Sequence, residues 1–297
     1  MKLLVTGAGG LIGSAVARAA VANGIEVVAC GRRTPTGLPD GVTSIGADLT
    51  DASAAATLVE TIAPSHIVHA AWETRQPTYW NDPVNLDWVV ATAAMAGAFA
   101  RVGGTRFLQI GSCAEYDWDG GVPMHDAPAT RYGKAKLAAF HAIETAAHAN
   151  FAAVDARIFW VYGPDENAAR FIPLLCRSYA AGVVPDLGSG QQRRDLIHID
   201  DAARALLMLL DDDAPTGVVD IGTGTGTLLA DVAVLIAGLA GASETGLGRK
   251  IDRPGDPAAL LADAAPLRST GWAPRITLHA GLERVFTGWQ ETHRDKS

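Results

Sequence analysis

Short apolar runs alternate with longer, alanine-rich segments over the first two thirds of the chain. The apolar runs are four to seven residues long and occupy residues 2–6, 26–30, 43–46, 66–70, 106–110, 153–159 and 218–221. The segments between several of them have helical length and cover residues 14–22, 53–62, 86–101 and 134–148. Short apolar strands separated by helices predict βαβ units and a parallel sheet that is buried on both faces. Right-handed crossovers then give a doubly wound α/β fold.

The pattern changes after Pro164 and predicts a second, smaller α/β lobe. Helical and turn-rich stretches then alternate, and they cover residues 171–181, 182–192, 196–210, 228–239 and 277–290. The stretch at 196–210 has the pattern of a strand and a helix that return to the first unit. We therefore predict two domains, which comprise residues 1–164 with 196–222 and residues 165–195 with 223–297.

The composition is that of a compact globular protein. Hydrophobic residues make up 48% of the 297 residues and charged residues 19%, which excludes a mainly disordered chain. A net charge of −8 argues against a general nucleic-acid or anionic-membrane surface. Three widely spaced cysteines predict no disulfide framework or zinc site, and the longest apolar stretch, 228–242, is too short to span a bilayer. We expect a soluble cytoplasmic protein with no nucleic-acid, membrane or metal partner.

A glycine-rich loop, Thr6-Gly7-Ala8-Gly9-Gly10-Leu11-Ile12-Gly13, follows the first predicted strand and opens the first helix. In such a loop the first glycine permits the tight turn, the second lets the backbone approach a pyrophosphate, and the third lets the helix pack on the strand. An ordinary glycine-rich turn is the alternative, and the strand-to-helix context favours dinucleotide binding. The residues expected to contact the cofactor here are Gly7, Gly10, Leu11, Ile12 and Gly13.

The end of the second predicted strand bears on the choice of cofactor. An Asp or Glu there would hold the adenosine ribose hydroxyls, but this chain has Cys30-Gly31-Arg32-Arg33. A guanidinium can pair with a 2′-phosphate that a carboxylate would repel, so Arg32 and Arg33 favour NADP(H) over NAD(H). The alternative is that both arginines only decorate a surface loop. Asp48 and Leu49 follow the third strand and are placed to meet the adenine edge, although Asp48 could instead cap the next helix.

Three further residues have the pattern of an acid–base site. Tyr132 and Lys136 are four apart and share one face of a helix. An ammonium beside a phenol is expected to lower its pKa and make it usable for proton transfer. Ser112 follows the fifth strand, at the carboxyl edge where open α/β sheets bind ligands. We predict that Ser112, Tyr132 and Lys136 form a catalytic set; an accidental Y-x-x-x-K match is the alternative.

These features together resemble an extended short-chain dehydrogenase/reductase of the NAD-dependent epimerase/dehydratase family, whose members mostly act on nucleotide sugars. The resemblance covers nearly the whole chain and implies a Rossmann-type fold. Besides the glycine loop and the catalytic set, it rests on Asp48-Leu49, His69-Ala70-Ala71, Asn85, Val161-Tyr162-Gly163-Pro164, the run from Arg194 to Asp201, and Arg253-Pro254-Gly255-Asp256. It implies that Ala70 and Ala71 also contact the cofactor.

The resemblance implies a substrate-binding set on the smaller lobe as well. Arg194 and Arg253 would clamp a diphosphate with their forked donors, and Asn167 would contact the nucleotide sugar. The alternative for Arg253 is a turn residue held by Asp256. Family members are often homodimers that associate through the helices at 85–100 and 132–148, and we expect a homodimer here. Structural roles are expected for His198, Asp200, Asp263 and Cys113.

Departures from the family pattern narrow the reaction. Sugar 4,6-dehydratases carry an Asp-Glu pair where this chain has Cys113 and Ala114, so dehydration is disfavoured; Glu115 comes one position late and should point to the other face. Trp160 replaces an Asn that is often found in 4-epimerases. Together with the NADP(H) prediction, this favours an NADPH-dependent reductase of a 4-keto nucleotide sugar.

In that reaction Tyr132 would donate the proton, Ser112 would polarise the carbonyl, and Lys136 would hold the cofactor ribose. A nucleotide-sugar epimerase with tightly bound NAD(P) is the main alternative. Reduction of a carbonyl compound that carries no nucleotide, and a non-catalytic NADP(H)-sensing protein, also stay open.

Overall fold

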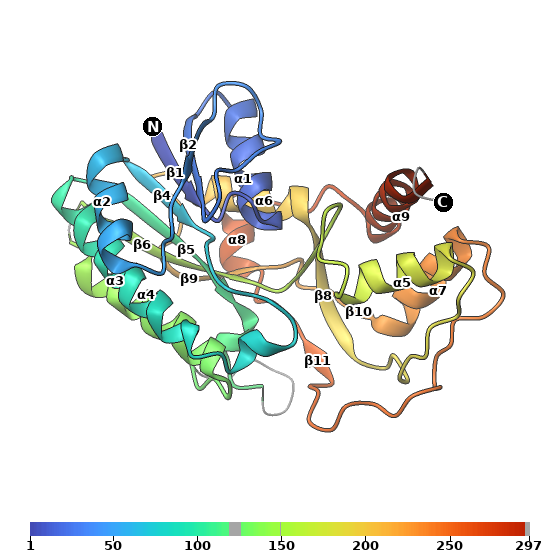
Figure 1. The fold of residues 1–297 in the computed structure, drawn as a ribbon. Coiled ribbons are helices and arrows are strands. Elements are labelled where there is room, and N and C mark those ends of the chain that lie inside the picture. The colour runs from blue at the N-terminus through green and yellow to red at the C-terminus, as the bar shows by residue number, and fades with distance from the viewer. Residues whose placement is uncertain (119–125, 149, 295–297) are drawn as a thin grey trace.

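Seven parallel strands form the central sheet of the protein, whose computed structural model describes residues 1–118, 126–148 and 150–294. The strand order is β3-β2-β1-β4-β5-β6-β9 (Figure 1). The strands are β1 (Lys2–Thr6), β2 (Glu26–Gly31), β3 (Thr43–Gly46), β4 (His66–His69), β5 (Arg106–Ser112), β6 (Ala152–Ile158) and β9 (Gly217–Ile221). All seven predicted strands are confirmed, each end within two residues of its predicted position.

Helices cover both faces of this sheet, as the apolar character of the strands predicts. On one face α1 and α6 pack against each other, and on the other α2, α3 and α4 lie side by side. The helices are α1 (Leu11–Ala22), α2 (Ala52–Ile62), α3 (Val84–Arg101), α4 (Arg131–Ala146) and α6 (Ile199–Met208). The architecture is therefore the doubly wound α/β fold expected from the sequence.

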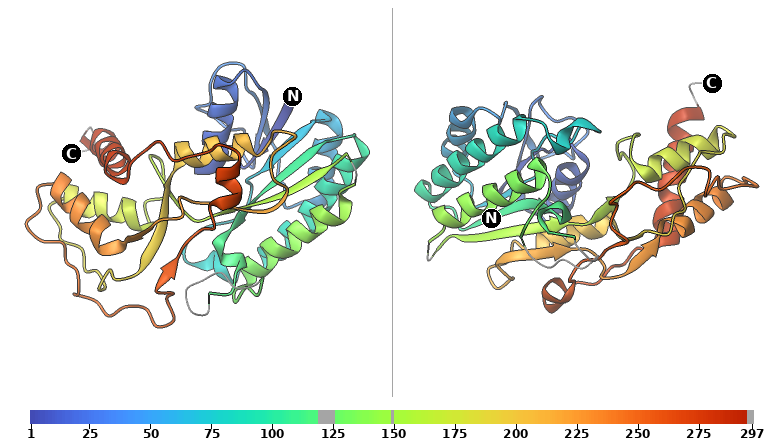
Figure 2. Two further views of the ribbon diagram at one scale, coloured as in Figure 1. Left: turned by 180° about the vertical axis from the view of Figure 1, so that it is seen from behind. Right: turned by 90° about the horizontal axis from the view of Figure 1, so that it is seen from below.

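A second, smaller lobe has its own sheet (Figures 1 and 2). It also has its own apolar core. Its strands are β7 (Trp160–Tyr162), β8 (Arg193–His198), β10 (Gly226–Leu228) and β11 (Ala259–Leu260), and its helices are α5 (Phe171–Ala180), α7 (Leu229–Leu239) and α9 (Leu278–Arg294). Strand β8 lies at the centre of this sheet, because β7, β10 and β11 all pair with it.

The predicted division takes each lobe from two stretches of the chain, but the chain passes between the lobes more often than this. Strand β8 belongs to the small sheet, but α6, which starts at the next residue, packs on α1. Late in the chain, α8 (Ala265–Ser269) returns to the large lobe, where Leu267 and Trp272 join the core beneath α1 and α6. Among the described residues, no helix combines the length and apolar character needed to span a bilayer.

Candidate active site

The glycine loop between β1 and α1 has the geometry of a dinucleotide-binding turn. Gly7 has φ +67°, and a Cβ atom there would lie 2.6 Å from the carbonyl carbon of Ala70 and from the backbone nitrogen of Ala71. A Cβ on Gly13 would lie 2.4 Å from the Gly7 carbonyl oxygen. Gly10 is the N-cap residue of α1 and supplies no side-chain cap, so the first-turn N–H groups of the helix are offered to an external anion. The residues present therefore fit a nicotinamide dinucleotide.

The arginines after β2 lie at the surface beside this loop. Arg32 is 71% exposed, and its Nη1 lies 3.9 Å from Glu73 Oε2, a weak pairing that leaves the guanidinium available. Arg33 is also exposed. The carboxylate of Asp48 accepts hydrogen bonds from the hydroxyl and backbone N–H of Thr50, which hold its pKa below the usual range.

The structure shows which residue caps the helix that follows β3. The helix cap is Asp51, whose side chain accepts from the N–H groups of Ser53 and Ala54 at the start of α2. The alternative capping role of Asp48 is therefore wrong. Leu49 is buried and packs in the core between the sheet and α2.

Ser112, Tyr132 and Lys136 are brought together at the carboxyl edge of the sheet. Ser112 is the last residue of β5, and Tyr132 and Lys136 lie one turn apart in α4, both buried. Close packing of α4 on the turn after Ser112 depends on Gly133, where a Cβ atom would lie 2.1 Å from the Ala114 carbonyl oxygen. The Ser112 hydroxyl lies near the Tyr132 phenol and favours its ionised form.

The electrostatics of Tyr132 differ from the sequence-based expectation. Burial raises the pKa of the Tyr132 phenol, and the nearby Ser112 hydroxyl opposes this only in part. The expected lowering by Lys136 is wrong, because the Lys136 ammonium donates to the Ile110 carbonyl at 2.8 Å and lies 3.8 Å above the ring of Trp72. Tyr132 is therefore a neutral phenol at physiological pH, a state that can donate a proton.

Lys136, unlike Tyr132, has a pKa close to physiological pH. Burial lowers its pKa to about 8, and the nearby carboxyls of Glu115 and Asp155 oppose the shift.

Aromatic rings surround the Tyr132 phenol. Tyr79 and Trp80, in the 3₁₀ turn η1 (Thr78–Trp80), lie edge-on to Tyr132 at 5.0 and 5.7 Å between centroids. These rings shield the Tyr132 phenol from bulk water.

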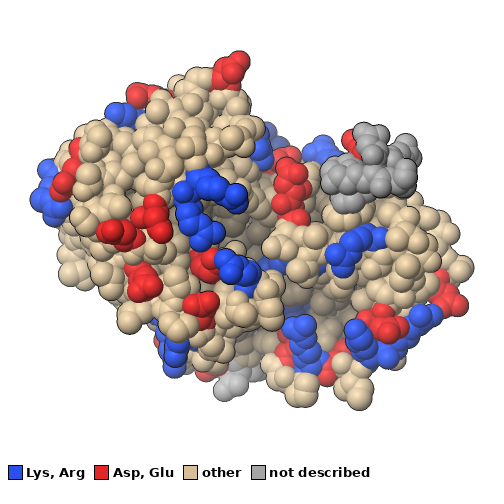
Figure 3. All heavy atoms as spheres, in the orientation of Figure 1, with Lys and Arg blue, Asp and Glu red and all other residues tan. Residues whose placement is uncertain are grey.

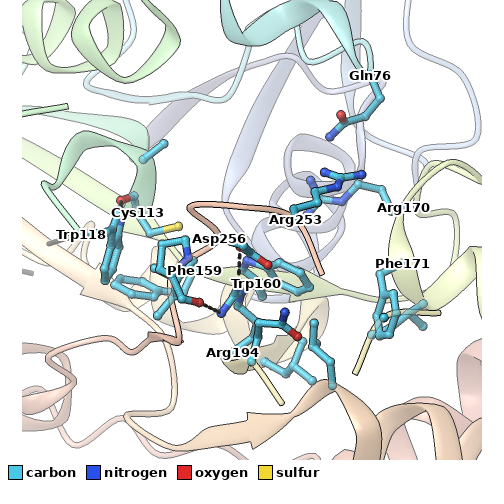
Figure 4. A pocket seen from close by; sticks show the side chains of 18 of the residues that line it. Gln76, Cys113, Trp118, Phe159, Trp160, Arg170, Phe171, Arg194, Arg253 and Asp256 are labelled. Carbon is cyan, nitrogen blue, oxygen red and sulfur yellow. Dashed lines mark hydrogen bonds and ion pairs between the residues drawn. The ribbon is translucent and has the colours of Figure 1, made fainter. Parts of the chain in front are cut away.

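A cavity of about 870 Å³ opens from Ser112 toward the small lobe. The space-filling view shows a hollow between the lobes with Lys and Arg side chains on its rim (Figure 3). Its apolar wall includes Cys113, Trp118, Phe159 and Trp160, and its cationic lining includes Arg170, Arg194 and Arg253 (Figure 4). An apolar wall with a few convergent cations suits a ligand that has both a ring and an anionic group.

The two arginines of the expected clamp differ in their burial and in their hydrogen-bond partners. Arg194 is 1% exposed, and its Nη2 donates to Asp256 Oδ1 at 2.6 Å while Nη1 donates to two backbone carbonyls (Figure 4). The Asp256 carboxylate thus holds Arg194, whereas Asp256 holds Arg253 through the backbone, where its N–H donates to the Arg253 carbonyl oxygen at 3.2 Å, so the alternative of a turn residue is confirmed. Arg253 is exposed and lines the cavity. Asn167 does not line it; its carboxamide oxygen accepts from the Ala169 N–H.

Several residues in or near the site carry no sequence-based prediction. Arg170 pairs with Glu166 at 3.1 Å, and burial raises the pKa of Glu166 to about 7. The i,i+4 spacing of this Glu and Arg after Gly163-Pro164 is the signal that could have found them. Trp72 comes directly after His69-Ala70-Ala71 at the end of β4, so the strand-end rule that located Ser112 could have found it too.

The remaining polar residues near the motifs are structural. His69 bonds Thr6 and Thr92, and burial lowers its pKa to about 3, so the ring is neutral. His198 caps α6 by accepting from the Asp200 N–H, and Asp263 accepts from the Ala265 N–H at the start of α8. These three positions therefore serve the fold.

Cys113 lines the cavity but is not activated as a nucleophile. Burial raises the pKa of its thiol to about 12, so the thiolate is not populated at neutral pH. Within the described residues, no group of three or more His, Cys, Asp or Glu side chains could hold a metal ion.

Comparison with known proteins agrees with this geometry. The model of the NAD dependent epimerase/dehydratase family matches residues 3–222. The chain belongs to this family. Its architecture is that of an extended short-chain dehydrogenase/reductase, since the fold and the family motifs extend over both lobes.

Relatives in this family differ in the reactions for which they are named. The chain is 29% identical to dTDP-glucose 4,6-dehydratase from Streptomyces niveus, over 98% of this chain and 93% of the relative. The structure of MoeE5 in complex with UDP-glucose and NAD is 28% identical, with a TM-score of 0.83 over 98% of this chain and 99% of that chain. The Thermus thermophilus UDP-glucose 4-epimerase complex with NAD has a TM-score of 0.85 at 21% identity, over 98% and 99% of the two chains, and shows the shared fold.

Proposed function

We propose that the protein is an NADPH-dependent reductase of a 4-keto nucleotide sugar. The observation that carries the proposal is that Ser112, with Tyr132 beside it, lines a cavity that is apolar on one wall and cationic on another. Binding of nucleotide sugars by relatives of the same architecture supports the substrate class. Cys113 and Ala114 follow Ser112, so no acid–base pair for eliminating water stands beside the reacting carbon.

NADP(H) is the cofactor in this proposal. The glycine loop and α1 would hold the diphosphate, and Arg32 and Arg33 would meet the 2′-phosphate without a competing carboxylate at the end of β2. Lys136 would donate to the ribose hydroxyls. When bound, the reduced nicotinamide supplies a hydride, and an exchangeable cofactor suits a net reduction.

The protein supplies the proton and the electrostatic environment. Tyr132, kept neutral by burial, donates its phenolic proton to the sugar oxygen. Ser112 donates a hydrogen bond to the same oxygen as negative charge develops there. Arg253 and Arg170 bind the anionic part of the substrate at the small lobe, while Arg194 stays paired with Asp256. The rings of Tyr79 and Trp80 beside Tyr132 limit the access of water.

A homodimer formed through α3 and α4 is part of the same proposal. Leu86 and Val90 are 66% and 54% exposed, and they lie one turn apart on the outer side of α3. Apolar side chains at this spacing are suited to pairing with another helix.

The test is NADPH oxidation, followed at 340 nm, by purified protein with a panel of 4-keto nucleotide sugars. We expect NADPH consumption that matches the sugar alcohol formed, and at least a hundredfold slower reaction for Tyr132→Phe, within the range of positioned acid–base catalysis. Interconversion of 4-epimers without net NADPH consumption would instead favour the epimerase. Tight NADPH binding without turnover of any panel member would favour the non-catalytic sensing protein.

A further inference from the structure

The turn after Ser112 is held from behind by a carboxyl group that the proposed reaction does not use. Ser112 N–H donates to Glu115 Oε1 at 2.7 Å, and Ala114 N–H donates to Ser112 Oγ at 3.1 Å. The two bonds form a capping box around the 3₁₀ turn η2 (Cys113–Glu115). Because Ser112 Oγ accepts from Ala114, the hydroxyl hydrogen remains to be donated toward Tyr132 or a substrate oxygen.

Glu115 has no contact with the cavity. Its side chain is 0% exposed, and it is absent from the cavity lining although Ser112, Cys113, Ala114 and Tyr116 are part of it. Its Oε2 lies 3.5 Å from Arg157 Nε instead. Glu115 is therefore turned away from any substrate, as its position in the sequence predicts, and cannot serve as an alternative proton donor.

Arg157 ties Glu115 to two further carboxylates. Its Nε lies 2.9 Å from Asp155 Oδ2 on the same strand, and its Nη1 lies 2.6 Å from Asp126 Oδ1, in the segment that leads to α4. Burial and the neighbouring Asp155 raise the pKa of Glu115 well above its ordinary value. A buried carboxyl group of this kind costs free energy, which hydrogen bonds and pairing must offset.

The same cluster reaches the helix that carries Tyr132 and Lys136. Gln109 Nε2 donates to Asp155 Oδ1 at 3.1 Å and to the Lys136 carbonyl at 3.0 Å. The space between is filled, since a Cβ atom on Gly111 would lie 2.2 Å from Asp155 Oδ1 and 2.9 Å from Glu115 Oε1. The cluster thus joins the turn of Ser112 to the backbone of α4.

We propose that Glu115 is a positioning residue, whose carboxyl oxygen fixes the turn that orients the Ser112 hydroxyl for catalysis. The inference rests on the proposed role of Ser112 in the reduction. Glu115 acts through the position of its carboxyl oxygen and not through its negative charge, because the turn is fixed by the hydrogen bond that Oε1 accepts from the Ser112 N–H.

Two conservative variants separate the effect of side-chain length from the effect of charge. Glu115→Gln keeps an oxygen at Oε1 and mimics a protonated carboxyl, so kcat should stay within about threefold of the wild type. Glu115→Asp keeps the charge but shortens the side chain by one methylene, so kcat should fall about tenfold or more, with KM and NADPH affinity nearly unchanged. Complete removal of one oriented donor typically costs about a hundredfold or more in kcat. Greater damage from Gln than from Asp would overturn the inference.

A double-mutant cycle tests whether Glu115 acts only through Ser112. We expect Ser112→Ala to lower kcat, and Glu115→Asp to cause no further loss beyond about twofold in that background. Multiplied losses in the double variant would overturn the inference. Full activity of Ser112→Ala would contradict the proposed role of Ser112 and remove the basis of the inference with it.

Crystal structures of both variants give a readout that does not depend on turnover. Glu115→Asp should break the bond to the Ser112 N–H and rotate Ser112 Oγ away from Ala114, whereas Glu115→Gln should keep both bonds. An unchanged Ser112 in Glu115→Asp would overturn the inference whatever the substrate proves to be. Melting temperatures of the variants, measured alongside, separate loss of orientation from loss of folding.

Discussion

The ammonium of Lys136 lies 3.8 Å above the ring of Trp72. Trp72 is itself fixed, because its Nε1 donates to Asn85 Oδ1 at 2.8 Å and its ring stacks on Trp88. A cation over a desolvated indole gains about 1–2 kcal/mol, which favours the charged form of the lysine. Trp72 therefore offsets part of the burial that lowers the pKa of Lys136 to about 8.

A pH dependence follows from this contact. Because the pKa of Lys136 is about 8, NADPH affinity and kcat/KM should both fall as the pH rises through 8 and the ammonium is lost. Trp72→Leu should lower that pKa further and move the alkaline limb of the pH profile down by about half a unit or more. Trp80→Leu is the control, since Trp80 packs on Tyr132 and not over the ammonium. An alkaline limb that stays in place in Trp72→Leu would contradict the account of Lys136.

The cofactor preference should depend on the arginines after β2. Replacing Arg32 and Arg33 together by Ala should weaken NADPH binding by a few kcal/mol and leave NADH binding nearly unchanged, since charge-assisted hydrogen bonds contribute about 1.5–3 kcal/mol each. Arg101→Ala is a matched control, because Arg101 pairs with Glu60 on the surface away from the loop. Titration of both cofactors by fluorescence measures the effect. Equal losses for NADPH and NADH would remove the main support for a reductase.

Tyr132→Phe keeps the buried ring and deletes the proposed proton donor. The rate should fall by about 10²–10⁴, the range that positioned acid–base catalysis supplies, with the melting temperature and NADPH affinity preserved. Tyr79→Phe provides the comparison, because Tyr79 packs edge-on to Tyr132 but has no assigned proton transfer. Steady-state kinetics check the prediction, and near-normal turnover of Tyr132→Phe would mean that another group donates the proton.

Arg194 and Arg253 should respond differently to substitution by Ala. Arg253 is exposed, so Arg253→Ala should raise KM for the nucleotide sugar and leave stability unchanged. Arg194 is buried, and its removal leaves two backbone carbonyls and the partly exposed Asp256 without their donor, so Arg194→Ala should also lower stability by about 1–3 kcal/mol. Chemical denaturation together with KM separates the two; equal stability losses would contradict the pairing of Arg194 with Asp256.

The sheet and its helices could be predicted from the sequence because local pattern encodes them. Each strand is an apolar run bounded by turn residues, and the parallel order follows from the helices between them. The strand-end rule likewise located Ser112 without a structure. The smaller sheet could not be predicted in detail, since β8 pairs with β7, β10 and β11 from three separate stretches, and three of its four strands are only two or three residues long.

Side-chain partners within the site could not be predicted in the same way. Arg194 pairs with Asp256, 62 residues later, and Gln109 with Asp155, 46 residues later, and no local spacing specifies such contacts. The pKa of Tyr132 was misjudged for a related reason. Its burial depends on rings from η1 and from the segment after β4, whereas the sequence pattern displayed only the neighbouring lysine.

The central claim is that a hydride leaves the cofactor and stays on the sugar. The most direct measurement uses NADPH carrying deuterium at both C4 positions of the nicotinamide, with a 4-keto nucleotide sugar, and mass spectrometry of the product. A net reductase should place one deuterium on the sugar in every turnover and oxidise one NADPH for each alcohol formed. A product without deuterium, or an epimer formed while the NADPH remains intact, would contradict the claim.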